Sequence, residues 1–168
     1  MKSACRMGII FLSALSISGQ TRGAINPVST IIEQPDALIK ITKYDAAYQE
    51  GVRCSREGIA HTVSYMNTSR RKIVAVQLGL VSFDVWNEFL DRTNGVSMAD
   101  LEPYGEDTGF WVATASADFQ FLTGVVYVAK VRFKEGEIWS VDLEEIAKEL
   151  REIEKGFDVS KLLETTEK

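Results

Sequence analysis

The stretch "IVAVQLGLVSFDVW", residues 73–86, is the strongest indication of the fold that we expect for this chain. From Ile73 to Phe83 apolar side chains occur at odd and at even positions, so a strand built from this segment is apolar on both faces. Such a strand is buried on both sides, with something packed over each face of its sheet. Gly79, in its middle, indicates a bulge or a close contact. We therefore predict that this strand is the centre of the fold.

Asp84 stops the apolar run, and we predict a structural role for it. An Asp at the end of a strand accepts hydrogen bonds from backbone N–H groups two residues further on, which fixes a turn. Contact with a ligand is the alternative.

Other segments alternate between apolar and polar residues and are expected to form strands. Residues 86–109 are polar and are expected to be an irregular loop, with a turn at Asn94-Gly95 and one helical turn capped by Ser97. One face of the strand near the C-terminus should carry Val125, Tyr127, Ala129, Val131 and Phe133. The predicted strands are 37–44, 59–67, 73–83, one within 110–122, 123–133 and 138–141.

A helix is expected only after these strands, over residues 142–155. Asp142 is a good N-cap with Glu145 three residues later, and Gly156 is placed as a C-cap. The apolar stripe at helical spacing consists of Leu143, Ile146, Ala147, Leu150 and Ile153. Short strands followed by one late helix favour a mainly β fold, an antiparallel β-sandwich with one C-terminal α-helix. This domain spans residues 37–156, after an extended lead-in at 25–36 and before a loose acidic tail at 157–168.

Residues 1–24 have the layout of a cleaved secretory signal peptide, with Lys2 and Arg6 before a short apolar run. A buried first helix or strand is the alternative. Cleavage would leave 16 of the 19 basic residues against 24 acidic ones, a formal charge of −8. We expect a secreted or periplasmic protein with no stable membrane anchor, which binds neither nucleic acid nor anionic lipid.

Signs of catalysis are few, so we expect a protein that is not an enzyme and needs no cofactor. The sequence has one histidine, His61, inside an alternating strand, where a half-buried position is favoured over a metal ligand or a general base. It lacks the serine-hydrolase, HExxH, CxxC and phosphate-loop motifs. After cleavage Cys54 would be alone, which leaves no partner for an internal disulfide.

The order "VSYMNTS", apolar strand, "SFDVWNE" within residues 63–90 resembles the core of FxLYD-type domains, which are small secreted immunoglobulin-like sandwiches. Phe83-Asp84 takes the aromatic-Asp place of that family and Asn87 its turn place. The resemblance implies an immunoglobulin-like sandwich and no enzymatic activity.

Acidic residues at 100–107 suggest a possible metal site. The segment begins like an EF-hand loop, but Tyr104 and Trp111 occupy ligand positions five and twelve, so the motif fails. A looser Ca²⁺ site remains a hypothesis beside a solvated acidic loop. Its ligands would be Asp100, Glu102, Glu106 and Asp107.

Aromatic residues flank the same region. Trp86, Tyr104 and Trp111 could form a platform for a sugar or a peptide, because flat apolar rings stack well. Core packing under the loop is the alternative. The leading functional hypothesis is an exported module that binds or supports another envelope or extracellular protein or glycan; the alternative is a carbohydrate or Ca²⁺ module using residues 84–111. Asn67-Thr68-Ser69 is a glycosylation sequon.

Overall fold

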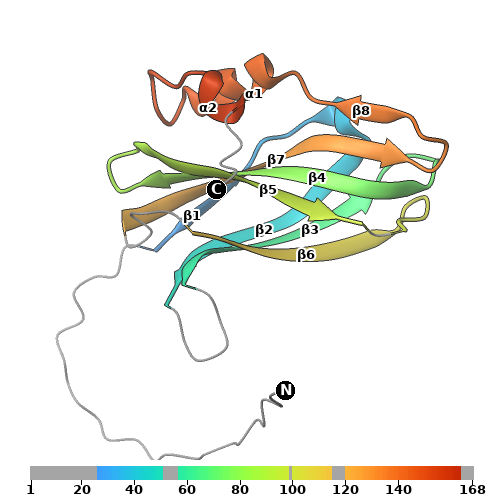
Figure 1. Cartoon of the computed structure of the whole chain (residues 1–168), viewed down its shortest axis with the longest axis horizontal. Coiled ribbons are helices and arrows are strands. Elements are labelled where there is room, and N and C mark those ends of the chain that lie inside the picture. Colours follow the sequence, from blue (N-terminus) through green and yellow to red (C-terminus); the bar gives the residue numbers. More distant parts are fainter. Residues whose placement is uncertain (1–25, 51–56, 99, 115–119, 164–168) are drawn as a thin grey trace, which may run out of the picture.

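The structure is a computed structural model, and it describes residues 26–50, 57–98, 100–114 and 120–163. Two helices and eight strands follow one another in these ranges, with a short 3₁₀ helix at Pro35–Ala37 (Figure 1). The elements are β1 (Val28–Ile31), β2 (Ile39–Gln49), β3 (Gly58–Asn67), β4 (Ile73–Asp84), β5 (Phe89–Ser97), β6 (Glu106–Ala113), β7 (Phe121–Phe133), β8 (Ile138–Ser140), α1 (Leu143–Leu150) and α2 (Ser160–Leu163).

The strands form two sheets that share one hydrophobic core, so the predicted mainly β fold is confirmed. One sheet has the order β1-β7-β4-β5, with β8 also paired to β7, and the other has the order β2-β3-β6. The second sheet is antiparallel throughout. In the first sheet β1 runs parallel to β7, which corrects the expectation of purely antiparallel pairing. About ninety residues separate these two strands, so no hairpin imposes an antiparallel direction on them.

Strand β4 is buried on both faces, as its composition predicts. Leu78 and Leu80 belong to the core between the two sheets. Val81 and Phe83 belong to a second apolar cluster on the other face of the sheet. The C-terminal residues that complete this cluster are Ile146, Ala147, Leu150, Phe157 and Leu162. Figure 1 shows both helices above the sheet that contains β4, on the side away from β2, β3 and β6.

Strand β7 does not keep one face from Val125 to Phe133, so that prediction was wrong. Its register against β4 shifts at Ala129, because Lys130 faces Gln77 while Val128 faces Leu78. Val125 and Tyr127 therefore lie under the helices, whereas Val131 and Phe133 point into the core between the sheets. A β-bulge of this kind changes which face each later residue occupies.

Gly79 makes the close contact that the sequence suggests. The ring of Tyr127 lies against it, and a Cβ at position 79 would overlap that ring. Asp84 has its predicted role too, because Oδ1 accepts hydrogen bonds from the backbone N–H groups of Trp86 and Glu88, both at 2.8 Å.

The expectation of an irregular loop at 86–109 was wrong. Strand β5 lies in this segment, and β6 begins at Glu106. Asn94 and Gly95 pair with Gly79 and Leu78 of β4 and form no turn, and Ser97 is the last residue of β5 rather than a helix cap. Pairing with β4 outweighs the local turn preference of these residues.

In the C-terminal segment the helix is shorter than expected, and the residues after it are better packed than expected. Asp142 caps α1 by accepting a hydrogen bond from Glu144 N–H at 2.9 Å, as predicted. However, α1 ends at Leu150, and Gly156 lacks the positive φ of a C-cap glycine. Residues 157–163 are not the loose segment that we expected, since Phe157 and Leu162 are buried over β4 and β7, and the rest of the expected tail, 164–168, lies outside the described residues.

Candidate functional site

The acidic residues considered for Ca²⁺ do not converge on one point. Asp100 and Glu102 both pair with the Lys72 ammonium, at 3.1 and 2.7 Å. Asp107 accepts a hydrogen bond from the Tyr65 hydroxyl at 2.8 Å, which lowers the pKa of its carboxyl group. Glu106 is exposed at the start of β6. Within the described ranges no group of three or more His, Cys, Asp or Glu side chains could hold a metal ion.

The three predicted aromatic residues are not brought together. Trp86 lies in the turn after β4 and is 76% exposed. Tyr104, 61% exposed, lies near the other end of that strand, because Leu101 pairs with Ile73 and the Tyr104 N–H donates to Asn67. A strand as long as β4 spans roughly 35 Å. Trp111 is partly buried between β6 and β5, against Gly95 and Gly109.

His61 and Asn67 are both buried and hydrogen-bonded inside the fold. The His61 side chain is fully buried, and its Nδ1 lies 2.9 Å from the Tyr44 hydroxyl. Burial lowers the pKa of His61 to about 4. Asn67 of the sequon is also fully buried, and its Nδ2 donates to the carbonyls of Arg71, Leu101 and Glu102. Sugar would have to be attached at this same nitrogen. Cys54 lies outside the described residues.

A groove opens beside β7, at the point where β1 ends and β8 begins as its neighbouring strand. Strand β1 pairs with β7 as far as Val126, and β8 pairs with it from Lys130 onward. Between them the Gln34 side chain takes the place of a strand residue. Its Nε2 donates to Val128 O at 3.0 Å and its Oε1 accepts from Val128 N at 2.6 Å.

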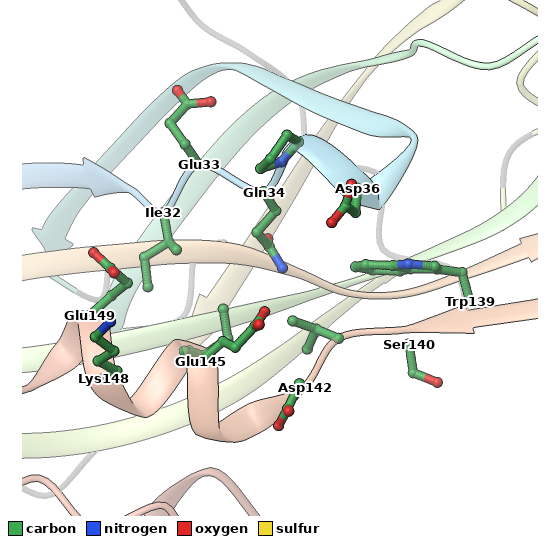
Figure 2. A pocket seen from close by; sticks show the side chains of 13 residues that line it. Ile32, Glu33, Gln34, Asp36, Trp139, Ser140, Asp142, Glu145, Lys148 and Glu149 are labelled. Carbon is green, nitrogen blue, oxygen red and sulfur yellow. The ribbon is translucent and has the colours of Figure 1, made fainter.

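The two chain segments diverge from this junction and leave a hollow of about 550 Å³. The segment after β1 forms one wall, and β8 with the first turns of α1 forms the other (Figure 2). Trp139, on β8, is partly buried against the core and also lines the hollow. In Figure 2 the Glu145 carboxylate and the Trp139 ring lie at different places along the wall formed by α1 and β8, and the Gln34 side chain points toward the space from the opposite wall.

The lining of this groove is strongly acidic. Five carboxylates and one cation, Lys148, line it; the carboxylates are Glu33, Asp36, Asp142, Glu145 and Glu149. Asp142 is engaged as the cap of α1. The other four make no ion pair with any residue in the described ranges. An aromatic wall, apolar side chains such as Ile32 and Ile146, and uncompensated negative charge suit an apolar cation.

Sequence reasoning missed this groove, because its two walls are about a hundred residues apart. From the sequence we expect an extended lead-in for the first wall and a hairpin followed by a helix for the second. One signal was present in the sequence. Acidic residues are frequent in both segments, and in the second segment they lie before and after Trp139. Their proximity depends on both β1 and β8 pairing with the same side of β7.

Comparison with known proteins gives a likeness of fold. No protein-family model matches the chain, and no curated protein matches its sequence. A solved structure titled as a hypothetical protein from Peptoclostridium difficile 630 is similar, with a TM-score of 0.52 and 9% identity; the match covers 70% of this chain and 93% of that one. The structural-genomics target SoR45 gives a TM-score of 0.43 and 14% identity, over 63% and 82% of the two chains.

The helices of the described ranges are too short or too polar to cross a membrane.

Proposed function

We propose that this protein is an exported, non-enzymatic binding module with an immunoglobulin-like sandwich, and that the groove beside β7 is its binding site. The secretory layout of residues 1–24 supports export, and the two packed sheets are compatible with the sandwich of FxLYD-type domains. The partner is another envelope or extracellular molecule.

One observation carries the choice of site. The groove combines about 550 Å³ of space with Trp139, which the core holds in place, and with four carboxylates that lack an ion-pair partner in the described ranges. Pockets of about 300–1,000 Å³ with an aromatic wall and a few polar groups are typical of ligand sites.

A binding role also suits the one histidine. His61 is closed off between the sheets and keeps its neutral form over most of the pH range, so it is poorly placed to act on a substrate. Among the described residues that line the groove, Ser140 has the one hydroxyl or thiol group, and that side chain points away from the space in Figure 2.

A thermal-shift screen of the purified protein against glycans, metals, amines and peptides tests the proposal. A ligand at 100 times its Kd adds about 2.7 kcal/mol to the free energy of unfolding, which is easily detected. We expect at least one shift that disappears in Trp139→Ala and persists in Trp86→Ala, since Trp86 is exposed elsewhere.

Two results would contradict the proposal. Shifts that depend on Trp86 but not on Trp139 would move the site to the β4–β5 turn. A hydrolase activity abolished by one carboxylate substitution would show that the protein is an enzyme. Export is tested separately, by the mass of the protein recovered from the native cell envelope or medium, which should lack the first residues.

A further inference from the structure

We infer that the groove binds an arginine or lysine side chain presented by an extended segment of a partner polypeptide, which adds to the free edge of β8. This inference rests on the proposed function, because it names the partner of the same site. It is built on three features of the groove: its charge, its aromatic wall and its backbone edge.

The charge of the groove calls for a cation. Glu33, Glu145 and Glu149 are exposed side chains that line it, and Lys148 is the one basic residue among the lining residues. A guanidinium or ammonium group that enters the groove is attracted by the carboxylates that line it. The formal charge of −5 for the whole chain attracts a basic partner from a distance as well.

The wall of the groove suits the shape of a long basic side chain. Trp139 is partly buried and packs against the core. Cations bind favourably over the face of an indole. Ile32 and Val141, which are partly exposed, also line the space and offer apolar contacts to the methylene stem of arginine or lysine.

The edge of β8 argues for a polypeptide rather than a free amine. The bonds Phe133 N to Glu137 O and Val141 N to Ala129 O show which residues of β8 face β7. In an antiparallel pair these positions alternate, so the N–H and C=O groups of Ile138 and Ser140 point away from β7. In the described part of the chain β8 pairs with β7 alone, which leaves this outer edge open. Exposed edges of this kind accept an added strand.

The backbone edge of β8 and the lined groove lie at the same place, since Ser140 and Trp139 of β8 themselves line the groove. A strand added along Ile138–Ser140 brings alternate side chains to the side of the groove. A basic residue at one of these positions then reaches the carboxylates while the backbone pairs with β8.

The test uses the full chain and the peptide acetyl-Arg-Val-Arg-Val-Arg-amide, with calorimetry to measure Kd. Three further probes separate the contributions: the same peptide with glutamine for arginine, the arginine peptide with N-methylated valines, and arginine amide alone. We expect the arginine peptide to bind best, with an affinity that falls as salt is added. The glutamine and N-methylated peptides should each bind at least about fivefold more weakly, because one lacks charge and the other cannot pair as a strand.

Charge-neutral variants test the residues without changing their size. Glu145→Gln should weaken the arginine peptide about threefold, and the triple substitution of Glu33, Glu145 and Glu149 by glutamine about tenfold or more. Glu152→Gln is the matched control, because Glu152 is an exposed carboxylate just beyond α1 that does not line the groove. Its Kd should stay within twofold of the wild-type value. These exposed positions can be changed without disturbing the core.

The possible results separate this inference from the proposed function. Arginine amide binding as tightly as the peptide, or no effect of N-methylation, would overturn the polypeptide inference and leave a site for free cations. If the arginine peptide does not bind but another ligand gives a Trp139-dependent shift, the inference fails and the binding module stands. If neither occurs, both proposals fail.

Discussion

The Gln34 side-chain amide forms two hydrogen bonds with the backbone of Val128, donating from Nε2 at 3.0 Å and accepting at Oε1 at 2.6 Å. One side chain thereby completes the edge of β7 between β1 and β8. The backbone on either side of Gln34 is then free to bend away, and the groove opens where it does so.

Replacing Gln34 by alanine should lower the free energy of unfolding by about 1–3 kcal/mol, because the Val128 N–H and C=O lose their partners in a partly buried place. Urea unfolding measures the change. Glu33→Ala, at the exposed neighbouring position, is the control and should be nearly neutral. Equal stability of the two variants would show that the amide pair contributes little.

Protein stability should fall as the pH drops from about 6.5 toward 4. Burial lowers the pKa of His61 to about 4 in the folded state, whereas an unfolded histidine takes up its proton near 6.5. The unfolded state binds more protons in this window, so acid favours unfolding, by about 3 kcal/mol in total.

The chain has one histidine, which makes this effect easy to assign. NMR titration of the imidazole should show a neutral ring down to pH 5, and His61→Gln should flatten the dependence of stability on pH between 5 and 6.5. A ring that titrates near 6.5 in the folded protein would contradict the buried position.

Substitution of Gly79 by alanine should destabilise the protein by about 1–3 kcal/mol, because a Cβ there overlaps the Tyr127 ring in the centre of the fold. Gly156→Ala is the matched control. Nothing lies within 4 Å of a Cβ at position 156, and its φ is not positive. We expect that variant to be neutral in thermal unfolding; similar losses at both glycines would argue against the ring contact.

Phe157→Ala should cost about 3–5 kcal/mol, the usual loss for a large buried aromatic residue. The Phe157 ring lies 6.0 Å from that of Phe83 and 5.8 Å from that of Phe89, between centroids. Leu163→Ala provides the comparison, since Leu163 is exposed at the end of α2. If chemical denaturation finds the two variants alike, the segment after Gly156 is a loose tail after all.

Much of the fold could be predicted from local pattern. The central place of β4 is predicted by its apolar residues at odd and even positions, and the start of α1 is predicted by Asp142. Strand β5 could not be found in this way. Its "DRTNG" residues favour a turn when taken alone, and only the ladder with β4 holds them extended.

The candidate site was beyond local pattern for a related reason. Trp86, Tyr104 and Trp111 are close in sequence, yet β4 and β5 carry them to different parts of the molecule. Gln34 and Trp139 are far apart in sequence, yet both lie along β7. Spacing in sequence indicates proximity only within one helix, strand or turn.

Local sequence pattern is enough to predict the mainly β class, the doubly buried strand, the Asp84 turn and the start of the helix, because these depend on neighbouring residues and on burial. The packing of distant segments sets the parallel pairing of β1, the bulge at Ala129 and the position of Phe157 over the sheet. It also brings Glu33 and Glu145 to one groove, because both β1 and β8 pair with the same edge of β7. Long-range pairing of this kind is a property of the whole chain, set by which strands bury each other's apolar faces.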